Sequence, residues 1–351
     1  MPSTCGLSNE ASVKQIRAGK ERRRALLLQG FYNGFYKLLQ IFLGADASAA
    51  QRYDEAFVGR LCGSICGRFN LQGDGVTDQQ QASQQELVTI DMQDGVADVR
   101  LNRPQKYNAL SPEMFAAIVA AGEQLSADHG VRAVVLSGNG PGFCAGLDMT
   151  SMSGLGSGEG SGGGGQLLAR DERPENFAQR PAMVWKRLPV PVVAALHGVA
   201  YGGGAQIALG ADIRIAAPDL KMSIMEIKWG LVPDMSISQT LRDVVPLDVA
   251  KELTFTGRIF SGDEAQELGL ATYVDADPHG RAMQIAREIA SKSPDAIRAG
   301  KKLLEEVWHA DERTGLELES SLQTALIGQP NQLEAVRANF EKRAPEFNNP
   351  E

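Results

Sequence analysis

The sequence is short of cysteine, of positive charge and of long apolar runs, and each shortage excludes a class of protein. Four cysteines in 351 residues are too few for a disulfide-stapled scaffold, and Cys62 and Cys66 lack a second pair of zinc ligands. The formal net charge of -8 argues against nucleic acid as the main partner. No run of 18 or more uncharged apolar residues occurs, so we expect no membrane-spanning helix.

Three motifs of nucleotide-binding and hydrolytic enzymes are also missing. The phosphate-binding loop GxxxxGK[ST] is absent, and the glycines at 138–142 do not complete GxGxxG because Phe143 is not glycine. The GxSxG turn of the α/β-hydrolases does not occur either. Permanent phosphate binding, dinucleotide binding and serine hydrolysis are therefore poorly supported.

The beginning of the chain differs in charge from the rest. Residues 1–45 hold seven Lys/Arg against two acids, which leaves 28 basic and 41 acidic residues in the remainder. This start is typical of an organellar transit peptide, and a basic helix that docks on the protein itself or on a partner protein is the alternative. We therefore expect a mitochondrial or other organelle matrix location, and otherwise a cytoplasmic one. A glutamine-rich linker ends near residue 86. The predicted organisation is a 1–85 extension, an 86–280 core and a 281–351 helical region.

After residue 86 the chain alternates between strand and helix patterns. Asp94-Gly95 between two β-rich runs predicts a hairpin, and Ser111 before Pro112 predicts a helix start. The apolar runs VRAVVLSG and VPVVAALHG are typical of buried strands, and later helices are expected after the caps Ser261 and Ser293. Such alternation predicts an α/β fold with a largely parallel sheet, whose active site lies at the carboxyl ends of the strands.

Two glycine-rich turns, GNGPGFCAGLD and VAYGGGAQ, follow these two strands. A glycine turn before a helix leaves backbone N–H groups free to meet negative charge. One N–H from each turn would give the two donors of an oxyanion hole. The tract at 154–165 is different, because its low complexity predicts a surface insertion.

Five motifs in order resemble the crotonase (enoyl-CoA hydratase/isomerase) superfamily, from about Leu87 to the C-terminus: LNRPQKYNALS, GNGPGFCAGLDM, PVVAALHGVAYGGGAQIALGADIRIA, MEIKWGLVPDM and TGRIFSGDEAQELGLATYV. The resemblance implies a spiral of ββα units with a helical C-terminal region, assembled as trimers or hexamers. It also implies acyl-coenzyme A thioester substrates, no metal, and no cofactor apart from the coenzyme A of the substrate.

The resemblance also assigns site residues. The thioester oxygen would be held by the N–H groups of Leu147 and Gly203. Coenzyme A contacts would fall near Gln105, Lys106 and Ala109. Asp148 is expected to brace its turn, and Trp229 to pack or to line the acyl pocket.

Acid–base residues depart from the hydratase pattern. Family hydratases use two glutamates, of which the second matches Glu226 and the first is replaced by Gln206. An amide exchanges no proton at neutral pH, so Gln206 counts as a residue that lines the site. Dienoyl-CoA isomerases add an aspartate at the position of Asp234, which could instead cap the next helix. We expect structural roles for His197 and Cys144.

Three hypotheses follow. The first is a double-bond isomerase of an enoyl- or dienoyl-CoA, with Glu226 as the proton shuttle and Asp234 assisting. The second is an enoyl-CoA hydratase that uses Glu226 alone. The third is a catalytically weak structural subunit of an assembly, which the long extension suggests.

Overall fold

The fold is built on two β-sheets. The computed structural model describes residues 86–148 and 170–350, all within the unit Ser83–Glu351. In this part of the chain a six-stranded sheet has the order β1-β2-β3-β4-β6-β8, and β5 pairs with β7 in a second sheet. Among the described strands, β1 and β2 pair antiparallel and the other pairs are parallel. The α/β prediction is confirmed. The strands are β1 (Val88–Gln93), β2 (Val96–Leu101), β3 (Ala133–Gly138), β4 (Val192–Leu196), β5 (Val199–Tyr201), β6 (Ile213–Ala216), β7 (Lys221–Ser223) and β8 (Tyr273–Val274).

The predicted extension at 1–85 and the glycine-rich insertion at 154–165 lie outside the described residues. The division at 86–280 and 281–351 stays a prediction.

The predicted hairpin is present between β1 and β2. Asp94 and Gly95 both have positive φ, 51° and 79°, and Gln93 pairs directly with Val96. A two-residue turn with both φ values positive matches the right-handed twist of the flanking strands, and glycine adopts it without a steric penalty. The Asp-Gly pair therefore sets the register of the sheet's first edge.

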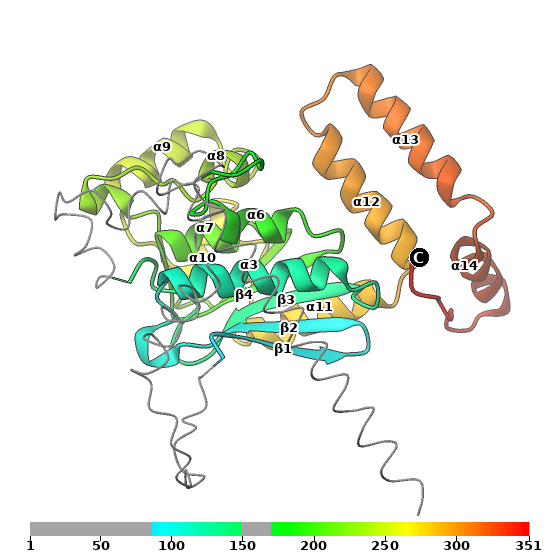
Figure 1. Cartoon of the computed structure of the whole chain (residues 1–351), viewed down its shortest axis with the longest axis horizontal. Helices are drawn as coiled ribbons and strands as arrows, with labels where there is room; N and C mark the ends of the chain where they lie inside the picture. The colour runs from blue at the N-terminus through cyan, green and yellow to red at the C-terminus, as the bar shows by residue number, and fades with distance from the viewer. Residues whose placement is uncertain (1–85, 149–169, 351) are drawn as a thin grey trace, which may run out of the picture. The chain divides into compact units, whose positions relative to one another are not determined.

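Helices cover both faces of the large sheet (Figure 1). Side chains alternate along β3, so that Val134 and Leu136 face one core while Ala133 and Val135 face the other. The first core is closed by α3 (Pro112–Ala127), α6 (Arg180–Lys186) and α7 (Gly203–Leu209), and the second by α11 (Pro278–Ala290). Burial on both faces explains why the central strands β3 and β4 are almost entirely apolar.

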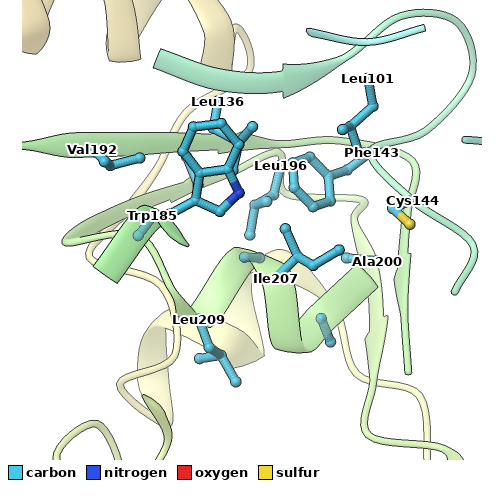
Figure 2. Packing of buried hydrophobic residues seen from close by; sticks show 14 of the residues in the cluster. Leu101, Leu136, Phe143, Cys144, Trp185, Val192, Leu196, Ala200, Ile207 and Leu209 are labelled. Carbon is cyan, nitrogen blue, oxygen red and sulfur yellow. The ribbon is translucent and has the colours of Figure 1, made fainter. Parts of the chain in front are cut away.

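Large side chains hold the first core together. Figure 2 shows Trp185 of α6 and Phe143 of the first glycine turn packed with Leu196 of β4 and Ile207 of α7. Trp185 and Phe143 are fully buried. Truncation of such a side chain costs about 3–5 kcal/mol, so this cluster anchors the helices that carry the glycine turns.

Helix starts follow the predicted caps in part. The Ser111 Oγ accepts from Met114 N at 3.4 Å, and the Ser261 Oγ accepts from Glu264 N at 3.1 Å. Ser293 stands at the N-cap position of its helix without a capping bond from its side chain. The alternative that Asp234 caps a helix is wrong, because the next helix has Ser236 at its N-cap.

The remaining helices are one short helix after β2 and a series that follows β7. They are η2 (Pro104–Lys106), η3 (Glu226–Trp229), α8 (Ile237–Thr240), α9 (Leu247–Thr256), α10 (Gly262–Glu267), α12 (Pro294–Val307), α13 (Glu312–Leu326) and α14 (Pro330–Glu341). The helical C-terminal region is thus confirmed. In the part of the chain that the structure describes, no helix is long and apolar enough to cross a membrane.

Candidate active site

The two glycine turns lie side by side beyond the carboxyl ends of β3 and β4. Cys144 N donates to Val199 O, and Tyr201 N donates to Cys144 O, both at 3.0 Å. A methyl group added at Gly146 would lie 3.6 Å from Gly203 N. Segments that are more than 50 residues apart in the sequence therefore form one surface.

Two glycines are required by this close approach. Gly146 has a φ of 84°, and a Cβ there would lie 2.6 Å from Tyr201 O. A Cβ at Gly204 would overlap the carbonyl oxygen of Cys144. Backbones that pass this closely leave no room for a side chain, which answers why the sequence concentrates glycine here.

The N–H groups of Leu147 and Gly203 are left without a backbone acceptor among the described residues. Leu110 N donates to Gly146 O at 2.8 Å, and Asp148 N donates to Leu110 O at 3.0 Å, so the Leu147 N–H points away from this pairing. Gly203 is the first residue of α7 and has no acceptor within its helix. Both groups are chemically able to donate to a ligand oxygen.

An ion pair braces the first turn. The Arg103 Nη1 donates to Asp148 Oδ2 at 2.6 Å and to Ala109 O at 3.1 Å, and Asp148 is 6% exposed. The pair joins two segments that are 45 residues apart. Asp148 therefore ties the first glycine turn to the segment of Arg103, as expected of a residue that braces its turn.

Asn108 is a residue that the sequence reasoning missed. It is fully buried with a φ of 55°, its Oδ1 accepts from Arg103 N, and its Nδ2 lies within hydrogen-bond distance of Gly142 O and Phe143 O. Asn108 thus ties η2 to the first glycine turn. Its place in the LNRPQKYNALS motif was the available signal.

Glu226 and Gln206 are brought together, although 20 residues separate them. The Gln206 Nε2 donates to Glu226 Oε1 at 2.6 Å, and the Gln206 Oε1 accepts from Met235 N at 2.8 Å. The second carboxylate oxygen, Glu226 Oε2, is buried and has no hydrogen-bond partner within the described part. One oxygen of the glutamate is therefore held by a hydrogen bond, and the other is buried without one.

The surroundings make Glu226 a stronger base than an exposed glutamate. Burial raises the pKa of Glu226, hydrogen bonds from its own backbone N–H and from Gln206 lower it, and the negative charge of Asp234 adds to the rise. Desolvation of the carboxyl also raises the pKa of Asp234, although the residue as a whole is exposed. Asp234 thus lies near enough to Glu226 for its charge to act on it.

The predicted coenzyme A contacts lie on or beside η2. Gln105 and Lys106 are exposed, whereas Ala109 is buried and offers its carbonyl to Arg103. Trp229 is 44% exposed at the end of η3, with Lys228 Nζ 5.4 Å from its ring centroid. Trp229 therefore lies outside the core, and its role in packing or in lining the acyl pocket stays a prediction.

Two other candidates have structural partners. His197 Nε2 lies 2.9 Å from Gly140 O and, because a carbonyl only accepts, donates to it. Burial raises the pKa of the Cys144 thiol to about 12, so it holds no thiolate at neutral pH and is no nucleophile. Within residues 86–148 and 170–350, no three His, Cys, Asp or Glu side chains gather in a way that could hold a metal ion.

Known proteins resemble the chain in sequence and in fold. A family model described as enoyl-CoA hydratase/isomerase matches residues 91–350. A mitochondrial methylglutaconyl-CoA hydratase of Mus musculus is 32% identical over 72% of this chain and 79% of its own. A peroxisomal Delta(3,5)-Delta(2,4)-dienoyl-CoA isomerase of Arabidopsis thaliana is 31% identical over 75% of this chain and 96% of its own. The crystal structure of an enoyl-CoA hydratase from Bacillus anthracis superposes with a TM-score of 0.68 at 29% identity, covering 75% of this chain and 100% of the other.

Proposed function

Because the chain belongs to the enoyl-CoA hydratase/isomerase family, we propose that it isomerises a carbon–carbon double bond of an enoyl- or dienoyl-CoA. The observation that carries this proposal is the pairing of Glu226 with an amide, Gln206, at 2.6 Å. A single carboxylate can move one proton between two carbons of the same substrate. Water addition by a pair of carboxylates needs a second acid, which Gln206 does not supply.

The reaction begins at the thioester. Its oxygen accepts from the N–H groups of Leu147 and Gly203, which stabilise the negative charge that develops when a proton leaves the adjacent carbon. For a 3-enoyl-CoA, Glu226 removes a proton from C2 and forms an enolate. The same carboxyl then returns the proton to C4, so that the double bond moves from C3–C4 to C2–C3 and the mass is unchanged.

A dienoyl-CoA requires a proton shift over a longer distance, for which Asp234 is the assisting acid. Its charge acts on Glu226, and its own pKa is raised by desolvation, which favours proton transfer near neutral pH. The likeness to the Arabidopsis dienoyl-CoA isomerase supports this substrate class.

A hydratase that uses Glu226 alone is the second candidate, and the similarity to the mouse methylglutaconyl-CoA hydratase favours it. In that reaction Glu226 removes a proton from water, the hydroxyl adds to C3, and the carboxyl returns the proton to C2. Gln206 would then act only through its hydrogen bonds.

Product analysis tests the two reactions. Purified full-length protein is incubated separately with 3-enoyl-, 2-enoyl- and 3,5-dienoyl-CoA, and the products are followed by absorbance and mass. Isomerisation leaves the mass unchanged, whereas hydration adds one water. Fast hydration of 2-enoyl-CoA without isomerisation would overturn the first candidate. If no product forms from an acyl-CoA of any chain length, both enzymatic candidates fail and the role of a structural subunit remains.

The proposal extends to assembly and location. The enzyme needs no cofactor beyond the coenzyme A of its substrate, and copies assemble as a trimer or hexamer. Exposed apolar side chains on the C-terminal helices, such as Trp308 (66%) and Phe340 (85%), support contact between copies. The mitochondrial mouse relative and the basic start of the chain support a mitochondrial location, which sequencing of the mature N-terminus tests.

A further inference from the structure

The geometry points to Gln206 as a positioning residue that decides which oxygen of Glu226 carries the transferred proton, an inference that rests on the proposed role of Glu226. Gln206 is fully buried in the first turn of α7, two positions after the last of the three glycines. Its amide bridges η3 and the loop before α8 through two short hydrogen bonds. Neither bond is exchanged for a bond to bulk solvent, because no part of the side chain is exposed.

The orientation of the amide follows from its neighbours. Met235 N–H can only donate, so the atom of Gln206 that faces it at 2.8 Å must be the oxygen. The Nε2 group must then face Glu226 Oε1, to which it can only donate. The bridge therefore has one direction, and a rotated amide would set two donors against each other.

The direction of the bridge gives the two Glu226 oxygens different roles. Oε1 accepts from an N–H at 2.6 Å, and a proton on Oε1 would weaken that bond because it removes the charge that strengthens it. Oε2 is buried without a partner in the part of the chain that the structure describes, so a proton on Oε2 disturbs no existing hydrogen bond. Proton removal and return therefore use Oε2.

A carboxylate at position 206 could not do the same. It would accept from Met235 N–H, but it could donate to Glu226 only when protonated, and two carboxyl groups at this distance share one proton. The proton taken from the substrate could then move to the carboxyl at position 206 instead of returning to the substrate carbon. The amide keeps Glu226 as the one carboxyl in contact with this bridge and leaves the proton for the substrate carbon.

Charge from a second element also acts on Glu226. Asp234, in the loop between η3 and α8, raises the pKa of Glu226, while the Gln206 N–H lowers it by stabilising the ionised form. Loss of the Gln206 donor therefore shifts the balance toward the protonated, inactive form of the base.

Two substitutions test the inference. Gln206→Met keeps the length of the side chain and removes both hydrogen bonds, and Gln206→Glu keeps the shape but removes the obligatory donor. We expect the acid-side limb of the kcat profile to move to higher pH in both variants. We also expect kcat to fall by about 100-fold, with little change in KM, because Glu226 loses its orientation.

The matched control is Thr240→Val, which removes another buried hydrogen bond, from Thr240 Oγ1 to Ser236 O at 3.2 Å. Its pH profile should coincide with that of the wild type. Thermal unfolding of each variant confirms folding, and Gln206→Glu serves if Gln206→Met does not fold. The positioning role would be overturned if the acid-side limb of the kcat–pH profile in both Gln206 variants coincided with that of the wild type.

Failure of the proposed function gives a different result. Full activity in Glu226→Gln would overturn the proposed role of Glu226 as the proton shuttle. If Glu226→Gln is inactive but the kcat–pH profiles of the Gln206 variants match the wild type, only the positioning role of Gln206 is overturned. Difference infrared titration of the wild type against Glu226→Gln follows the Glu226 carboxyl without turnover. Its midpoint must rise in Gln206→Met if the bridge acts as inferred, and an unchanged midpoint contradicts the bridge.

Discussion

Glu226 lies directly against Gly202, where an added methyl group would be 3.2 Å from Glu226 Oε1. The next residue after Gly202 carries one of the two N–H groups that face the proposed thioester oxygen. The Glu226 oxygen that Gln206 holds therefore lies beside the residue that precedes Gly203, which places the proposed base next to one of the two proposed oxyanion donors.

Glu226→Gln should abolish turnover, with a loss of at least about 100-fold in kcat, because the amide cannot take up a proton. Binding of acyl-CoA, measured by calorimetry, should remain, since the N–H donors and η2 are untouched. The exposed Glu267→Gln on α10 is the matched control and should behave as the wild type. Unchanged turnover in Glu226→Gln would remove the proton-shuttle role.

Acidification should inactivate the wild type above the pH expected for an ordinary glutamate. Glu226 acts in its ionised form, and burial raises its pKa, so activity is lost as the pH falls through that raised value. In Asp234→Asn the negative charge that raises the pKa of Glu226 is gone, and the acid-side limb of kcat should move to lower pH.

The same variant separates the two isomerase substrates. If Asp234 is the second acid for 3,5-dienoyl-CoA, Asp234→Asn loses dienoyl-CoA turnover while it retains most of the turnover of 3-enoyl-CoA. An equal loss with both substrates would mean that Asp234 does not select the substrate class.

Gly146→Ala should impair both folding and activity. Its left-handed backbone costs about 1–2 kcal/mol for alanine, and the new Cβ would press on Tyr201 O. The displacement of Leu147 N–H should lower kcat by about 100-fold. Gly328→Ala has nearly the same φ, 81° against 84°, with nothing within 4 Å of the new Cβ. Equal effects of the two substitutions on the free energy of unfolding and on kcat would contradict a role for close packing.

Lys301→Met should loosen the attachment of α12. The Lys301 side chain is 7% exposed, and its Nζ donates to Asp212 Oδ2 at 2.7 Å and to Val190 O at 3.0 Å. Its removal leaves a largely buried carboxylate and should lower the free energy of unfolding by about 3 kcal/mol, measured with urea.

This loss should shrink at low pH. Without the ammonium group the pKa of Asp212 rises further, so protonation neutralises the carboxyl as the pH falls. The control Lys302→Met removes an exposed pair 4.0 Å apart and should change stability by less than about 1 kcal/mol. A similar change in both variants would mean that the buried pair does not hold α12.

Local signals predicted the elements well because their causes are local. The Asp94-Gly95 hairpin needs only two residues with positive φ, and the cap of α3 needs only Ser111 and the first turn. The same reasoning failed at Asp234. Met235 N is bonded to Gln206, and Ser236, with a φ of 72°, takes the N-cap position instead. A contact over 29 residues overrode a local preference.

The sequence by itself determined the alternation of strands and helices, the glycine turns and the replacement of one family glutamate by Gln206. Those follow from side-chain chemistry and from periods of a few residues. Only the tertiary structure decided that Gln206 donates to Glu226 and that Arg103 pairs with Asp148 across 45 residues. Contacts of this kind depend on how separate segments pack around the sheet, and no local pattern of residues encodes which atoms will meet.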